Sequence, residues 1–279
     1  MLKLATTPQE HDAATNNNEG KTHPVPTTHT PSTNYADNRY QQPLFRSEEQ
    51  NLTFRAIAGH PFEEPEYTGK EFRPDEVKLL APMLPSKIVL IEDNHGDGEP
   101  NFLLKPPTAV IGPGAPIRIP AAAMGAAFEG QLALVIGKPC KDVAAADWRS
   151  AVFGATILND VSAVGLDTPG EQAVRARAFD TFCPVGPWID TDLESLNVED
   201  TEVIGHVTRG EEKTTYEEAS TSSIVWSFGE MIEYVSHTMT LLPGDIIATG
   251  LPVKQHQLAA GDTVTIEVEG LGQLRNRVL

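Results

Sequence analysis

The sequence predicts a β-rich α+β fold with a few short helices. Most apolar segments are short and lie between turns that contain Gly or Pro, which is typical of strands. Several of them alternate apolar and polar residues, the period of a strand with one buried face. One longer segment, residues 223–238, spaces its apolar residues as a helix does. Many short strands with one long helix indicate the α+β class.

The expected elements can be located in chain order from their composition and boundaries. Strands are expected at residues 52–57, 76–82, 88–91, 102–105, 108–112, 116–120, 128–137, 155–158, 186–190, 202–208, 213–217, 246–249, 262–269 and 273–278. Residues 209–212, between two of these strands, predict a hairpin with a four-residue loop. Short helices are expected at residues 148–152, with Asp147 as the N-cap, and within residues 171–178.

The composition divides the chain of 279 residues into three parts. Residues 1–50 are rich in Thr, Asn, His, Pro and Gln and show neither a strand nor a helix period, so we expect a mostly disordered polar segment. Residues 51–84 predict a small N-terminal β region. Residues 85–279 are numerous enough to bury a sizeable core and form the main domain.

The charge limits the partners that this protein can bind. Lys and Arg number 21 against 39 Asp and Glu, which gives a net charge of −18. Such a surface repels nucleic acid and anionic membranes but does not exclude a small anionic substrate, which local positive charge or a metal can bind. No apolar run is long enough to cross a bilayer, and the N-terminus lacks the profile of a secretory signal. With only two cysteines, the chain is expected to be soluble and cytoplasmic.

Three polar side chains occur in or directly after predicted strands. Glu129 and Gln131 are two residues apart and therefore point to the same face of their strand. Asp160 follows the apolar run at residues 155–158. Oxygen atoms are the ligands that hard divalent cations prefer, so these three residues are candidate metal ligands.

Six segments carry motifs that are informative in combination. They lie at residues 80–89, 105–113, 128–137, 159–163, 179–188 and 239–250. They include Phe-Glu-Gly-Gln-Leu-Ala, Asn-Asp-Val-Ser, Phe-Asp-Thr-Phe-Cys-Pro and Leu-Pro-Gly-Asp. In this order they resemble the fumarylacetoacetate hydrolase family, particularly its bacterial 2-hydroxyhepta-2,4-diene-1,7-dioate isomerase-like branch. Six ordered matches are far more specific than one.

The resemblance implies a fold, a cofactor and a class of reaction. It implies a mixed β-sandwich roll, usually a homodimer, with residues 85–279 as the catalytic domain. Family members bind Mg²⁺ or Mn²⁺ through a Glu-x-Glu pair and the Asp of Asn-Asp-Val-Ser. The metal acts as a Lewis acid on a small 2-oxo or dioxo carboxylic acid. The implied reactions are C–C hydrolysis, decarboxylation and keto–enol isomerisation.

Several positions of this chain differ from the family pattern. Glu129 and Asp160 match metal ligands, but the second Glu of the pair is Gln131, an amide that lowers the negative charge of the site. The family lysine corresponds to Arg177, which we expect to pair with a substrate carboxylate but not to transfer protons. Thr249 and Gly250 keep the start of a substrate-binding motif, whereas residues 251–256 do not.

The lid is the largest difference. The family pairs a His with a Glu on a mobile lid to activate water, and this chain has a shorter polar segment at residues 94–100. His95 and Glu99 are candidates for that pair. The alternative is an ordinary polar turn with an exposed histidine.

Two hypotheses follow for the function. In the first, the protein is a metal-dependent enzyme with an altered site, and decarboxylation or tautomerisation survives the loss of a water-activating pair better than hydrolysis does. In the second, it is a catalytically silent homologue that keeps the dimeric scaffold for binding or regulation, because the differences concentrate at one site. A retained fold does not guarantee a retained activity.

Overall fold

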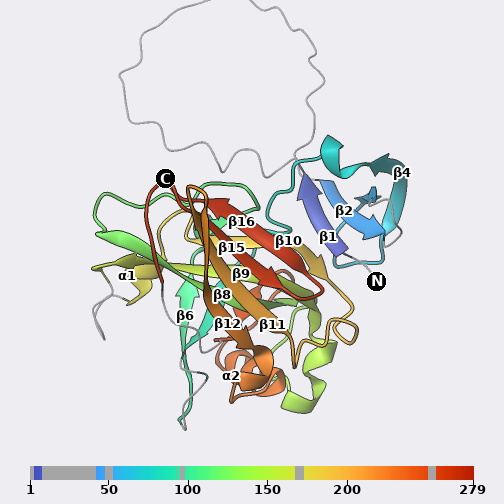
Figure 1. The fold of residues 1–279 in the computed structure, drawn as a ribbon. Helices are drawn as coiled ribbons and strands as arrows, with labels where there is room; N and C mark the ends of the chain where they lie inside the picture. The colour runs from blue at the N-terminus through green and yellow to red at the C-terminus, as the bar shows by residue number, and fades with distance from the viewer. Residues whose placement is uncertain are drawn as a thin grey trace, which may run out of the picture.

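The computed structural model describes residues 3–7, 42–47, 53–92, 94, 98–166, 173–250 and 256–279. Strands dominate it, and the prediction of a β-rich α+β fold is confirmed. A four-stranded sheet lies against part of a larger sheet, and a small group of N-terminal strands lies at one end (Figure 1). Among the described residues, no helix is both long and apolar enough to span a bilayer.

The strands and helices have the following bounds. The strands are β1 (Lys3–Thr7), β2 (Gln42–Ser47), β3 (Thr53–Ala58), β4 (Glu66–Phe72), β5 (Ile88–Glu92), β6 (Asn101–Lys105), β7 (Val110–Ile111), β8 (Gly125–Ile136), β9 (Val152–Val164), β10 (Cys183–Asp190), β11 (Glu202–Arg209), β12 (Glu212–Ser220), β13 (Ile246–Ala248), β14 (His256–Leu258), β15 (Thr263–Val268) and β16 (Gly272–Arg277). The α-helices are α1 (Ala173–Arg177) and α2 (Phe228–Thr238).

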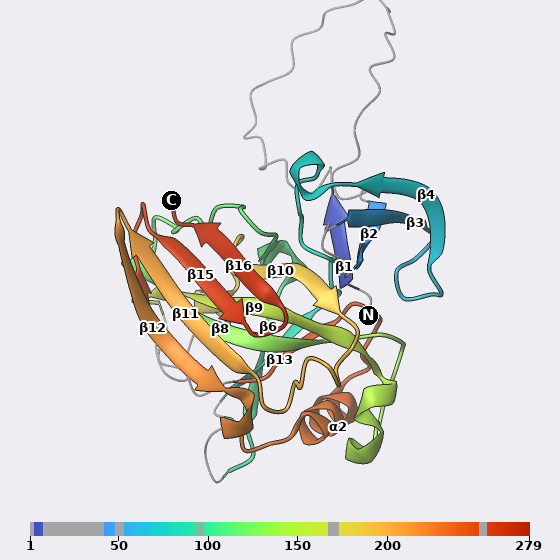
Figure 2. The same ribbon diagram turned by 45° about the vertical axis from the view of Figure 1, so that its right-hand side comes forward.

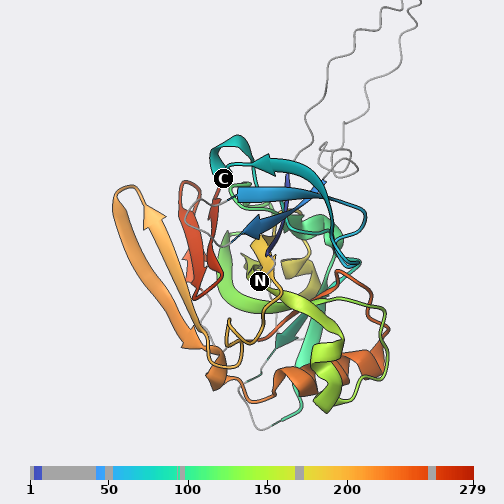
Figure 3. The same cartoon turned by 90° about the vertical axis from the view of Figure 1, so that its right-hand side faces the viewer.

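The larger sheet curls back on itself. Its order is β4-β3-β2-β1-β10-β9-β8-β13-β5-β6, and β14 also pairs with β8. Strand β7 follows β6 after one 3₁₀ turn and pairs in parallel with β10. The run from β10 through β9, β8, β13, β5 and β6 therefore closes into a roll, which appears in Figure 3 as the curved green strands at the centre.

The two faces of this roll build two different cores. Inside lie the apolar side chains of one strand face, among them Leu90, Ala133 and Leu158. The opposite face, with Leu132 and Ile157, packs against the four-stranded sheet β12-β11-β15-β16 and against α2. Figure 2 shows these two layers side by side. Because side chains alternate along a strand, strands β5, β8, β9 and β13 each contribute to both cores.

Two predicted strands do not form, and several observed strands were not predicted. The segment expected as a strand at residues 116–120 forms only an isolated bridge, between Ile117 and Val278. The strand expected at residues 76–82 is wrong, since this segment begins in a 3₁₀ turn, Pro74–Glu76, and forms only an isolated bridge at Leu80. Strand β4 pairs with β3 in this region. It was not predicted because its residues are exposed and show no apolar alternation. Two further strands, β1 and β2, lie within the segment expected to be disordered. The remainder of residues 1–50 lies outside the described residues, and the prediction for that segment stays a prediction.

Some element ends also differ from the predicted ones. Helix α2 begins at Phe228, five residues later than expected, because Ser227 and Glu230 form a capping box. The hairpin of β11 and β12 turns over two residues instead of four, since pairing continues to Arg209 and Glu212. The helix expected at residues 148–152 is the 3₁₀ segment Ala145–Ser150, which Asp147 does not cap.

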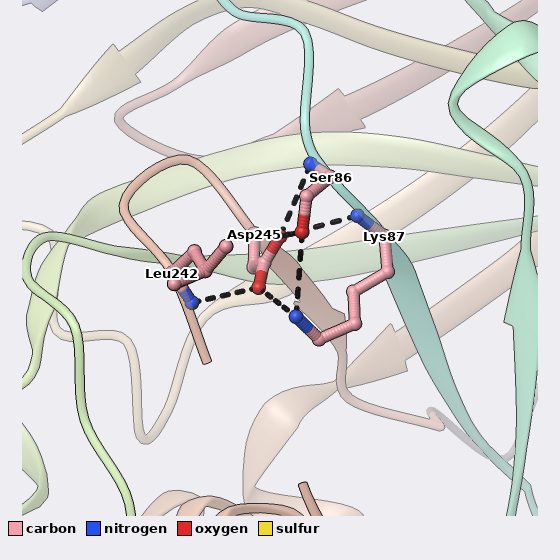
Figure 4. A network of polar contacts seen from close by, with 4 residues as sticks. All are labelled: Ser86, Lys87, Leu242 and Asp245. Atoms are coloured by element: carbon pink, nitrogen blue, oxygen red, sulfur yellow. Dashed lines mark hydrogen bonds and ion pairs between the residues drawn. The ribbon is translucent and has the colours of Figure 1, made fainter. Parts of the chain in front are cut away.

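A buried carboxylate joins the start of β5 to the turn before β13. Asp245 is fully buried. Its Oδ1 accepts hydrogen bonds from Ser86 N (3.1 Å), Ser86 Oγ (2.6 Å) and Lys87 N (3.1 Å). Its Oδ2 accepts from Leu242 N (2.8 Å) and pairs with Lys87 Nζ (Figure 4). All of these partners donate, so both carboxylate oxygens act as acceptors.

We expect the substitution Asp245→Asn to destabilise the fold. The new amide nitrogen would face the N–H of Leu242 or the ammonium of Lys87, both of which are donors. Leaving such groups unpaired in a buried site costs about 3 kcal/mol of unfolding free energy. Urea unfolding measures this loss. The matched control is Asp75→Asn, whose side chain is 64% exposed and pairs with Arg73, and a loss as large in the control would contradict the argument.

Candidate active site

Three polar side chains lie together at one end of the roll. Strands β8 and β9 pair so that Glu129 is directly opposite Asp160, and Gln131 is opposite Leu158. Leu158 belongs to the inner core of the roll. Since residues two apart share a face, all three polar side chains point to the inner side. The structure thus brings the sequence-predicted metal ligands onto one face.

Asp160 is held by two cations. Its side chain is 8% exposed. Lys105 Nζ lies 2.6 Å from Asp160 Oδ1, and Arg177 Nε donates to Asp160 Oδ2 at 3.3 Å. Two opposite charges fix the orientation of this carboxylate more strictly than one would. One cation comes from β6 and the other from α1.

Arg177 pairs with a second carboxylate that was not predicted as a site residue. Its Nη2 lies 3.1 Å from Glu92 Oε1, at the end of β5. The Arg177 side chain is 8% exposed, and that of Glu92 is 28% exposed. The planar guanidinium therefore bridges Asp160 and Glu92. Two protein carboxylates already bind Arg177, the residue that was predicted to hold a substrate carboxylate.

Lys105 links the last strand of the roll, β6, to the segments around Asp160. Its side chain is completely buried. Besides the ion pair, Nζ donates to the carbonyl oxygens of Val161 (2.8 Å), Arg177 (3.1 Å) and Phe182 (2.8 Å). These acceptors lie on β9, at the end of α1 and before β10. A single ammonium thus ties β6 to three distant segments.

Asn94 anchors the chain beyond β5. Its Nδ2 donates to the carbonyl oxygens of Thr249 (2.9 Å) and Trp226 (3.3 Å), and its Oδ1 accepts from Trp226 N (2.7 Å). Thr249 is buried, and its hydroxyl donates to Leu132 O at 3.0 Å. Gly250 has φ +69, and a Cβ there would lie 2.5 Å from Ile91 O, so only glycine fits.

The remaining predicted site residues are not brought together in the described part of the chain. His95 lies outside the described residues. Glu99 is exposed. The predicted His–Glu pair, and the substrate-binding roles of Thr249 and Gly250, stay predictions.

A cysteine inside the roll can be excluded as a nucleophile. Cys183 is buried close to Lys105 and Asp160. Burial raises the pKa of its thiol to about 12. The thiol therefore stays protonated at neutral pH, and a protonated thiol is a poor nucleophile.

The donor set fits a hard divalent cation, with less charge than three carboxylates would supply. Among the described residues, no three His, Cys, Asp or Glu side chains are placed to hold a metal ion. The third member of the group here is the amide of Gln131, whose oxygen can coordinate but carries no charge. Glu129, Gln131 and Asp160 together offer two carboxylates and one amide oxygen to Mg²⁺ or Mn²⁺.

Sequence reasoning missed Lys105, Glu92 and Asn94 as site residues. A signal existed for two of them. Glu92 continues the inward alternation of Ile88 and Leu90, and Lys105 is opposite Ile88 in the register. A charged residue at an inward position of an apolar strand needs a buried partner. The sequence therefore indicates that these charges need buried partners, but it does not identify the partners.

The chain matches known families over most of its length. Residues 85–279 match the family model described as fumarylacetoacetate (FAA) hydrolase C-terminal, and residues 48–82 match Rv2993c-like, N-terminal. Protein Rv2993c of Mycobacterium tuberculosis is 45% identical over 242 residues, covering 83% of this chain and 90% of that protein. The crystal structure of 2-hydroxyhepta-2,4-diene-1,7-dioate isomerase from Mycobacterium marinum is 42% identical, with a TM-score of 0.80, and covers 87% of this chain and 95% of that chain.

Two more distant relatives are informative about chemistry. Oxaloacetate tautomerase FAHD2A, mitochondrial, of Bos taurus is 34% identical, covering 73% of this chain and 70% of that protein. The crystal structure of maleylpyruvate hydrolase from Sphingobium sp. SYK-6 in complex with manganese(II) ion and pyruvate has a TM-score of 0.68 at 27% identity. It covers 85% of this chain and 96% of that chain.

Proposed function

This chain belongs to the fumarylacetoacetate hydrolase family, and we propose that it is a divalent-metal-dependent enzyme acting on small 2-oxo or dioxo carboxylic acids. The observation that carries the proposal is the pairing of Glu129 opposite Asp160, with Gln131 on the same face. These three residues would hold Mg²⁺ or Mn²⁺. The manganese ion and pyruvate in the related maleylpyruvate hydrolase support this choice of cofactor and substrate class.

A divalent cation held by these residues would supply Lewis acidity, which polarises a 2-oxo group and favours loss of a proton or of CO₂ from the neighbouring carbon. Two residues of this chain orient the candidate ligand Asp160. Lys105 and Arg177 fix Asp160 in one position, since each holds one of its oxygens. Arg177 also binds Glu92, so both carboxylates that it contacts here belong to the protein.

Keto–enol tautomerisation is the reaction that these residues support best. The guanidinium of Arg177 stays protonated at neutral pH and cannot serve as a base. The Lys105 ammonium is completely buried among three carbonyl oxygens and Asp160. Hydrolysis needs a water molecule activated by a base. Tautomerisation moves a proton from the enol oxygen to the neighbouring carbon and consumes no water, so it requires proton transfer but no water nucleophile. The bovine relative is named as an oxaloacetate tautomerase.

The test measures the conversion of enol-oxaloacetate to its keto form, monitored as the loss of enol absorbance. Decarboxylation of oxaloacetate and cleavage of an acylpyruvate are measured in parallel on the same preparation. We expect Mn²⁺-dependent tautomerisation that EDTA abolishes and added Mn²⁺ restores. Absence of Mn²⁺ binding together with absence of all three reactions would contradict the proposal and favour the catalytically silent homologue.

A further inference from the structure

The charges around Asp160 are closely balanced. In the described part of the chain, Lys105 and Arg177 are the two cations that contact this carboxylate. Glu129 is opposite Asp160 in the register and adds a second negative charge. Gln131, on the same face, adds none. Two carboxylates against two cations would leave the group neutral, and a neutral group attracts a divalent cation weakly.

Glu92 changes this balance. Its Oε1 lies 3.1 Å from Arg177 Nη2, while Arg177 Nε donates to Asp160. We propose that Glu92 is a positioning residue that neutralises Arg177 and so keeps the Glu129–Gln131–Asp160 group negative enough to bind a divalent cation. This inference rests on the proposed function, because it assumes a cation at that group.

The fold explains why a carboxylate at position 92 can do this. Strand β5 pairs with β13, and β13 pairs with β8, so β5 lies two strands from the candidate ligands. Ile88 and Leu90 point into the roll, and the alternation carries Glu92 to the same inner side. Glu92 is the last residue of β5, and 28% of its side chain is exposed.

The geometry also separates this role from metal ligation. The same guanidinium contacts Glu92 and Asp160, and among the described residues no three His, Cys, Asp or Glu side chains are placed to hold one metal ion. Glu92 would therefore alter the affinity for the cation by charge and by the orientation of Arg177, without contributing a ligand atom. If Glu92 acts through charge, its loss should be compensated by any second substitution that restores the net charge of the group.

The experiment measures the affinity of the purified, metal-free full-length protein for Mn²⁺ by isothermal titration. The variant Glu92→Gln keeps the shape and an acceptor for Arg177 but removes the charge. We expect its dissociation constant for Mn²⁺ to rise about tenfold, the order expected for removing one nearby charge. The exposed Glu218→Gln removes a charge from β12 and is the matched control, with no change expected.

Two double variants test whether charge is the cause. Glu92→Gln with Gln131→Glu adds a carboxylate back, and Glu92→Gln with Arg177→Gln removes the cation that lost its partner. Both restore the net charge of wild type, and we expect both to bind Mn²⁺ more tightly than Glu92→Gln alone. Thermal unfolding of each variant checks that the fold is retained.

The outcomes separate this inference from the proposed function. Wild-type binding with unchanged affinity in Glu92→Gln overturns the inference and leaves the proposed function standing. A weakened Glu92→Gln that neither double variant improves also overturns it, because Glu92 would then act by ligation or shape. No Mn²⁺ binding by wild type overturns both.

Discussion

Replacing Lys105 by Met is expected to produce the largest loss of stability among single substitutions at the site. The variant would leave Asp160 with Arg177 alone and would remove the donor shared by three carbonyl oxygens. Removing one partner of a buried ion pair costs about 3–5 kcal/mol of unfolding free energy. Urea unfolding, with the slope checked for two-state behaviour, measures the change.

The length of Lys105 and Met is similar, so the loss would report the ammonium group and not a cavity. Lys138→Met is the matched control, because Lys138 is exposed on the surface. We expect the control to change the unfolding free energy by less than about 0.5 kcal/mol. A loss below about 1 kcal/mol for Lys105→Met would mean that the roll closes without this ammonium.

Replacing Glu129 by Gln is expected to produce the largest loss of activity. The change keeps the size of the side chain and leaves Asp160 as the only carboxylate among the three candidate ligands. We expect the affinity for Mn²⁺ and the rate of tautomerisation each to fall by roughly two orders of magnitude, since hard cations depend on charged oxygen ligands. Titration with Mn²⁺ and the enol assay measure the two quantities on one preparation.

A substitution at position 131 changes the charge of the same face in the opposite direction. Gln131→Glu is isosteric and adds a charge on the same face, so it should tighten Mn²⁺ binding where Glu129→Gln weakens it. Both variants should keep the unfolding free energy within about 1 kcal/mol of wild type. Equal Mn²⁺ affinity in both variants would contradict the assignment of this face as the metal site.

The sequence by itself determined the parts of the fold that have a strong period. Strands β5, β8 and β15 were expected close to their observed positions, and helix α2 was expected with its observed end, because buried alternation and a helical stripe are local properties of the chain. Strand β4 has neither, since it is exposed along nearly its whole length. Its position depends on pairing with β3, which no local pattern encodes.

The same division applies to the candidate site. Glu129 and Gln131 share a face because side chains alternate along a strand, and this follows from the sequence alone. The positions of Lys105 and Glu92 do not follow from it. Lys105 contacts Val161, Arg177 and Phe182, which follow it in the sequence by 56, 72 and 77 residues. Only the curling of the sheet brings β6 back to β9. The sequence therefore determined which oxygens share a face, and the tertiary structure decided which charges surround them, because closure of the roll depends on contacts between distant segments.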